Sequence, residues 1–262
     1  MALPFPIPAS LSPAFTMSHA TEADADSLAE IYYTAFETDP GNTYWWPADK
    51  EPMMEWTVRR TRNKMRDRTM RHFKVTDDQT GDVVAFARWD IPHGSTKFGE
   101  WLGGDEQLDV SALVGSEGEA VRQPAATSPA AAAPAPLTGG SDKPAMDIPP
   151  GADAELCRDF FDGLSRMSSK WMTQDMLSLS LIATSTKYFK RGAAKALILP
   201  MLEIADAEGV KAYLEATPAG NPVYEKMDFR EVDSLEFNLD ELTKDHHGIY
   251  RLCIMIREPS KQ

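Results

Sequence analysis

One tyrosine is the residue of this sequence best suited to acid catalysis. Tyr224 lies in NPVYEKMDF, Asn221 to Phe229, a pattern that predicts a short helix ending at an aromatic residue. A phenol has a reference pKa of about 10, so it stays protonated at neutral pH and can donate its proton to a developing anion. Tyr224 is therefore a candidate general acid, and its alternative role is a core aromatic packed against Phe229.

A basic turn upstream of Tyr224 is suited to bind an anion. An uncharged apolar run, Met176 to Thr184, leads into STKYFKRGAAK, where Ala193 and Ala194 follow Gly192. Such a turn at a helix start leaves the first N–H groups unpaired, and the helix dipole there favours negative charge. Four basic residues surround the turn: Lys187, Lys190, Arg191 and Lys195. The turn predicts a site for a phosphate-bearing ligand, and the alternative is a basic helix start on the surface.

Two sequence blocks extend this pattern. They are YFKRGAA, Tyr188 to Ala194, and YLEATPAGNPVYEKMDF, Tyr213 to Phe229. Together they resemble the acetyl-CoA-binding half of the GCN5-related N-acetyltransferase (GNAT) superfamily, and most of all its fungal small-molecule-type members. The family's turn, Gln/Arg-x-x-Gly-x-Gly/Ala, falls here on residues 189–194. Phe189 stands where the family has a polar residue, which implies one lost contact to pyrophosphate but an intact backbone cradle.

The resemblance implies acetyl-CoA as co-substrate, without a metal, and assigns residues to it. Ile182, Ala183 and Thr184 match the place where the family's fourth strand splays from the fifth and offers backbone groups to the pantetheine arm. The other residues implied in cofactor binding are Lys190, Arg191, Gly192, Ala193, Ala194, Lys195 and Asn221. Tyr224 matches the tyrosine that protonates the departing CoA thiolate in many members.

Transfer to an amine also requires an unprotonated acceptor, and so a base that acts directly or through water. Many relatives have a carboxylate within the fourth strand, whereas the matching stretch here offers Ser178 and Ser180, with Asp175 just before it. Glu215, near the end of the next predicted strand, is the second candidate. Its alternative role is that of a structural hydrogen-bonding partner, and the choice of base stays open between Glu215 and Asp175.

The first predicted helix leads to a pair of tryptophans. Residues 17–36, MSHATEADADSLAEIYYTAF, predict a short strand and a helix, and TDPGNTYWWP then predicts a loop. In the family, the segment after the first helix often borders the acceptor pocket. Trp45 and Trp46 are therefore candidates for acceptor contact, and the alternative is that they close the core.

The remaining segments complete one mixed α/β domain over about 17–259, with a mostly antiparallel central sheet and flanking helices. A basic helix over 51–71 and a hairpin over 71–92 come before a composition shift to Ala, Pro, Gly and Ser. We expect a disordered insertion at about 110–148 and a disordered Pro-rich leader over 1–16. A helix at 153–172 and closing strands within 236–259 follow, and whether translation starts at Met1 or Met17 stays open.

Composition narrows the partners. The net charge of −13 argues against nucleic-acid binding and favours cationic acceptors such as amines. Cys157 and Cys253 lack the spacing of a zinc site or disulfide framework, no membrane span is expected, and the predicted compartment is the cytoplasm. The prediction is a monomeric or homodimeric acetyltransferase for small-molecule amines. A CoA-binding module with little catalysis and a protein acetyltransferase are the alternatives.

Overall fold

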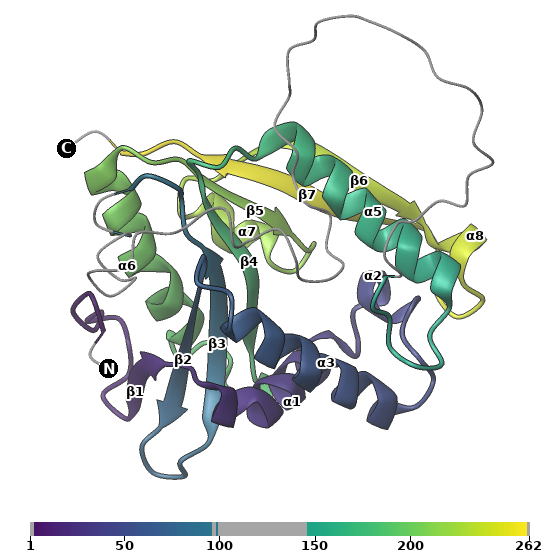
Figure 1. Ribbon diagram of the computed structural model, residues 1–262, viewed down its shortest axis with the longest axis horizontal. Helices are drawn as coiled ribbons and strands as arrows, with labels where there is room; N and C mark the ends of the chain where they lie inside the picture. Colours follow the sequence, from purple (N-terminus) through teal and green to yellow (C-terminus); the bar gives the residue numbers. More distant parts are fainter. Residues whose placement is uncertain (1–2, 96–97, 99–145, 261–262) are drawn as a thin grey trace, which may run out of the picture.

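A seven-stranded sheet forms the centre of this computed structural model, which describes residues 3–95, 98 and 146–260 (Figure 1). The strand order is β1-β2-β3-β4-β5-β7-β6, and β4 and β5 alone run parallel to each other. The strands are β1 Phe15–His19, β2 Met70–Asp77, β3 Val83–Asp90, β4 Leu177–Thr184, β5 Ala212–Ala216, β6 Arg230–Asn238 and β7 Ile249–Arg257. The expected mixed, mostly antiparallel sheet with flanking helices is confirmed.

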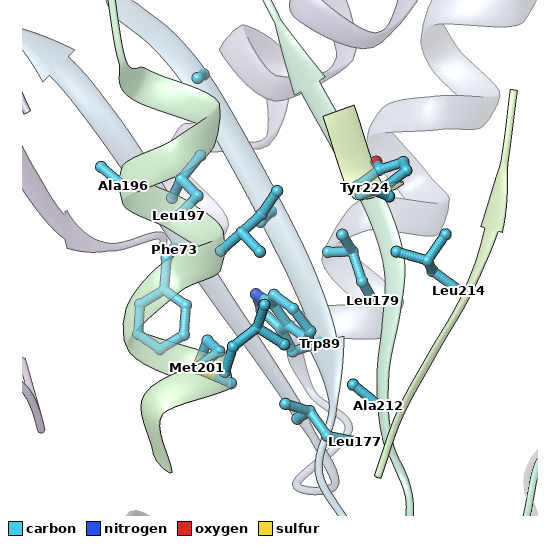
Figure 2. Close-up of a cluster of buried hydrophobic side chains, with 14 of the residues drawn as sticks. Phe73, Trp89, Leu177, Leu179, Ala196, Leu197, Met201, Ala212, Leu214 and Tyr224 are labelled. Carbon is cyan, nitrogen blue, oxygen red and sulfur yellow. The ribbon is translucent and has the colours of Figure 1, made fainter. Parts of the chain in front are cut away.

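One face of the sheet packs against α6, Ala193–Glu208. Alternate side chains of β3, such as Trp89, point to this face because strand residues two apart share a side. Figure 2 shows Leu197 and Met201 of α6 on the side of the helix that faces the strands, in one buried cluster with Phe73 and Trp89. The short helix α7, Asn221–Glu225, adds Tyr224 to the same cluster.

The opposite face packs against helices from distant parts of the chain. The helix α1, Ala25–Phe36, contacts β3 and β4, and α3, Lys50–Met65, contacts α1 and β2. The helix α5, Ala154–Trp171, runs along β6 and β7, as Figure 1 shows. Two short helices complete this side, α2 at Pro40–Thr43 and α8 at Leu239–Leu242.

The two parallel strands separate after a short ladder. Pairing between β4 and β5 ends at Leu179 and Leu214, although β4 continues to Thr184. At the same point β4 carries a bulge, because Leu179 and Leu181 pair with consecutive residues of β3 and leave Ser180 between them. The sheet therefore opens between β4 and β5, and backbone groups of β4 beyond Leu179 have no β5 partner.

The leader differs from the sequence expectation in its described part, residues 3–16. Leu11 and Phe15 are buried, and the ring of Phe5 packs edge-on against Phe73 with 5.3 Å between centroids. The strand β1 begins at Phe15, so the packed domain starts before Met17. The prolines of the leader exclude a helix, but the apolar side chains between them still cover the edge of the core.

The expected insertion at about 110–148 lies outside the described residues except for its last three. Two of those three, Asp147 and Ile148, contact the second face of the sheet. The carbonyl of Asp147 accepts a hydrogen bond from Trp56 Nε1 at 3.1 Å, its carboxylate pairs with Arg59 at 2.6 Å, and Ile148 contacts the core around Trp45.

Within the described ranges, every helix is too short or too polar to cross a bilayer.

Candidate active site

The start of α6 is an open anion cradle. Gly192 is the N-cap, and no side chain caps the helix. The N–H of Ala196 bonds to the Gly192 carbonyl at 2.9 Å, whereas the N–H groups of residues 193–195 have no hydrogen-bond partner within the described part of the chain. Unpaired N–H groups at the positive end of a 16-residue helix suit the pyrophosphate of CoA. Ala194 is partly exposed there, and Ala193 is buried.

The backbone of the turn explains its glycine. Gly192 has φ +86°, and a side chain here would place its Cβ 2.5 Å from the carbonyl oxygen of Ser10. Lys190 also has a positive φ, +64°, so two residues of the turn adopt the left-handed backbone conformation just before the helix. The Arg191 guanidinium lies over the rings of Phe15 and Tyr188, at 5.9 and 5.4 Å. These contacts, one with Phe15 of β1 and one with Tyr188 of the turn, hold the Arg191 guanidinium next to the cradle.

The residues expected to bind pantetheine border the opening between the parallel strands. Ile182, Ala183 and Thr184 pair with β3 on one side and have no β5 partner on the other. Asn221, the first residue of α7, has a buried Oδ1 without a hydrogen-bond partner in the described part of the chain. A buried carbonyl that lacks a donor is suited to accept from an amide N–H of the pantetheine arm. The residues present therefore fit acetyl-CoA.

Tyr224 lies in the same buried cluster as Leu179 and Leu214, the last pair before the strands separate (Figure 2). Its ring is 8% exposed and packs edge-on against Phe229 at 6.0 Å. Burial raises the pKa of Tyr224 to about 12, so the phenol keeps its proton at neutral pH. Within the described ranges no group hydrogen-bonds its hydroxyl. The ring is thus a core aromatic residue, and the role of its proton as a general acid stays a prediction.

Glu215 lies on the opposite face of the sheet from α6. Leu214 packs in the α6 cluster, so its neighbours Tyr213 and Glu215 point to the other side. The Tyr213 hydroxyl donates to Glu215 Oε1 at 2.8 Å. Glu215 is half-buried and comes directly after the last β4–β5 pair, which places it beside the opening. Glu215 therefore stays a candidate base, and Tyr213 orients its carboxylate.

Asp175 lies at the wrong end of β4 for this role. It precedes the strand, whereas the opening begins after Leu179, and four residues of extended chain span roughly 13 Å. Its carboxylate accepts a hydrogen bond from the Thr173 hydroxyl, and this bond lowers the pKa of Asp175. A carboxylate with a lowered pKa is a weaker base, so geometry and electrostatics both argue against Asp175.

The two tryptophans have different surroundings. Trp45 is 1% exposed and packs against Trp56, Phe160 and Phe161, as expected of a core residue. Trp46 is partly exposed and stacks on Tyr32 at 5.8 Å between centroids. Trp46 is therefore the member of the pair with surface available to an acceptor.

Two charged groups of the sheet had no signal in the sequence patterns. Arg88 of β3 donates from Nε to Ser180 Oγ at 3.0 Å, at the bulge of β4. On the other side of the sheet, Arg257 of β7 forms two hydrogen bonds with the Asp206 carboxylate, at 2.6 and 2.8 Å, and bonds the Met227 carbonyl at 3.0 Å. It thereby ties α6 to the segment after α7. Each group joins residues far apart in the chain, which local spacing does not reveal.

Two surface depressions lie away from this site. The larger, ≈ 480 Å³, follows the outer side of α3 between Asp26 and Arg66. The other, ≈ 300 Å³, lies at the far end of the sheet, around Asp90, His93 and Gln174. No residue of the opening or of the cradle lines either depression. The candidate site is therefore defined by the separation of β4 and β5. In the part of the chain that the structure describes, no group of three or more His, Cys, Asp or Glu could hold a metal ion.

Comparison with known proteins identifies the fold. No protein-family model and no curated protein matches the sequence. Among solved structures, arylalkylamine N-acetyltransferase 2 from Aedes aegypti is similar at TM-score 0.55 and 13% identity, over 94% of this chain and 99% of that one. The structure of "histone acetyltransferase HPA2 and related acetyltransferase" from Corynebacterium glutamicum is similar at TM-score 0.51 and 18% identity, over 95% of this chain and 98% of that one. The chain has the GNAT acetyltransferase fold.

Proposed function

We propose that this protein is a GNAT-superfamily enzyme that transfers the acetyl group of acetyl-CoA to the primary amine of a small metabolite. Two observations support this proposal. The strands β4 and β5 separate after Leu179, and the uncapped start of α6 has three backbone N–H groups without a hydrogen-bond partner among the described residues. This arrangement supports a phosphate site at the helix start, beside strand backbone of β4 that has no β5 partner. Cys157 and Cys253 are free and buried thiols, which agrees with a reducing, cytoplasmic compartment.

The two sides of the opening have complementary chemical roles. The amine nitrogen attacks the thioester carbonyl carbon, the C–N bond forms, and the C–S bond breaks. Tyr224 donates its proton to the departing sulfur, and its raised pKa keeps that proton in place until charge develops. Glu215 takes the proton lost by the amine, directly or through water, while Tyr213 holds its carboxylate. Backbone N–H groups of β4 near the bulge are available to the carbonyl oxygen.

A thiol-release assay tests the proposal. Wild-type protein is mixed with acetyl-CoA and a panel of small primary amines, with lysine-bearing peptides and protein N-termini as a second panel. We expect CoA release and N-acetylated product with at least one small amine. Turnover on peptides or proteins alone would replace the small acceptor with a protein. Stoichiometric acetyl-CoA binding without turnover on either panel would show a CoA-binding module in place of an enzyme.

A further inference from the structure

Three basic side chains gather on the sheet face opposite α6. Arg60 and Lys64 are four residues apart on α3, which places them on one side of the helix. Their neighbours Arg62 and Arg66 point outward and pair with Asp26 and Glu22, both at 2.8 Å. Arg60 and Lys64 lie instead where burial lowers the pKa of each side chain.

Arg88 of β3 joins this group at the opening between β4 and β5. Ala87 and Trp89 pack in the α6 cluster, so Arg88 between them points to the other face. Its Nε donates to Ser180 Oγ, and Ser180 in turn donates to the Arg88 carbonyl at 3.3 Å. Ser180 is the first β4 residue beyond the last pair with β5. The guanidinium is thus fixed at the bulge that borders the opening.

The two Nη groups of Arg88 remain available for a ligand. Of the residues that the structure describes, only Ser180 bonds to this side chain, and no carboxylate lies within ion-pair distance of it. Arg88 is partly exposed. A planar guanidinium whose Nε is already held presents its two Nη groups as a fork that matches a carboxylate or phosphate.

Electrostatics supports an anion at this place. Burial, followed by the charge of nearby Arg60, lowers the pKa of Arg88 to about 10. Burial, followed by the charges of Arg88 and Arg60, lowers the pKa of Lys64 to about 8. Asp67 and Asp90 raise both pKa values again. A bound anion beside Arg88 would favour the charged form of its guanidinium.

We propose that Arg88 binds an acidic group of the acceptor, so that the substrate is a small amine that also carries a carboxylate or a phosphate. This inference rests on the proposed function, because it assigns the substrate class of the same site. The amine then lies toward Glu215 on the β5 side of the opening, and the acid toward Arg88 on the β3 side. The local positive charge selects the acceptor despite the net charge of −13.

Matched pairs of amines test this assignment. Tyramine is compared with tyrosine, histamine with histidine, and ethanolamine with both serine and phosphoethanolamine, by thiol release at saturating acetyl-CoA. In the wild type, kcat/KM is expected to be at least tenfold higher for an acid-bearing member than for its neutral partner. Carboxylate and phosphate acceptors are distinguished by whether serine or phosphoethanolamine is preferred.

Two variants connect the preference to Arg88. Arg88→Gln keeps a donor near Ser180 but removes the charge, so KM for the acid-bearing amine should rise by at least tenfold, with the neutral partner and acetyl-CoA affinity unchanged. Arg88→Lys should retain part of the preference and serves if Arg88→Gln does not fold. The matched control is Arg62→Gln on the outer side of α3, which should leave the preference intact.

The outcomes separate the two proposals. Equal use of both members by the wild type, or a preference that survives Arg88→Gln, overturns the anion site and leaves acetyl transfer standing. If no amine is acetylated, acetyl transfer to small amines fails, and calorimetry of CoA-loaded protein with succinate and with phosphate decides the anion site alone. Binding that Arg88→Gln abolishes upholds the site, and absence of binding overturns it.

Discussion

The two faces of the sheet differ in how their functional groups are brought together. On the α6 face, the cradle, Asn221 and Tyr224 come from one stretch of the chain, residues 176–232, so their spacing in the sequence resembles their spacing in space. On the opposite face, Arg60, Arg88 and Glu215 come from α3, β3 and β5, with other elements between them. The difference explains why local sequence motifs predict the residues of a candidate cofactor site, whereas they do not predict which distant residues meet at a candidate acceptor site.

The largest expected effect separates catalysis from binding on the α6 face. Tyr224→Phe keeps the ring and its packing on Phe229 but removes the proton that we assign to the sulfur. We expect kcat to fall by about 100-fold or more with acetyl-CoA affinity unchanged, as measured by steady-state kinetics and calorimetry. The control, Tyr33→Phe on α1, should keep wild-type kcat. An unchanged kcat in Tyr224→Phe would reduce Tyr224 to a core aromatic.

A second prediction concerns the stability of the same face. Asp206→Asn breaks the paired hydrogen bonds with Arg257, whose side chain is 7% exposed, and should lower the free energy of unfolding by about 2–3 kcal/mol at pH 7. Glu203→Gln, an exposed change on the same helix, should cost under about 0.5 kcal/mol in denaturant melts. Equal losses in the two variants would contradict the assigned role of the pair.

The same pair gives a pH dependence. Burial opposes the ionisation of Asp206, but hydrogen bonds from Arg257 and Ser260 outweigh it and lower the pKa of Asp206 below its ordinary value. A lowered carboxyl pKa stabilises the fold above the unfolded value, and this contribution is lost as pH falls through the folded value. Wild-type stability should therefore decline below about pH 4 more steeply than that of Asp206→Asn. Parallel curves would show that other carboxylates dominate acid unfolding.

The smallest expected effect restores the family's turn pattern. Phe189 is 54% exposed, so its replacement removes little packing. Phe189→Gln should strengthen acetyl-CoA binding by about 1 kcal/mol, or about fivefold, the net value of one hydrogen bond. Ile249→Gln, an equally exposed apolar position on β7, is the control and should not change affinity. Weaker binding in Phe189→Gln would mean that the aromatic ring itself contacts the ligand.

The sequence predicts the sheet class because periodic strands leave local signals, and the Gly-containing helix start on the α6 side lies where the sequence places it. Prolines in the leader exclude a helix but do not exclude packing, and Leu11 and Phe15 are buried against the core. Tyr213 and Glu215 share a face of β5 because they are two residues apart, whereas the contact of Arg88 with Ser180 follows from strand register and a bulge. Register depends on long-range pairing that no short motif encodes.

The central claim is that acetyl-CoA binds at the start of α6, and one calorimetric titration tests it. Ala194→Glu adds a carboxylate beside the open N–H groups without the positive φ and the close Ser10 carbonyl that complicate Gly192. The control, Ala207→Glu, makes the same change at an exposed position near the other end of the helix. The account predicts at least a 100-fold loss of acetyl-CoA affinity in folded Ala194→Glu and wild-type affinity in the control. Wild-type affinity in folded Ala194→Glu would contradict it.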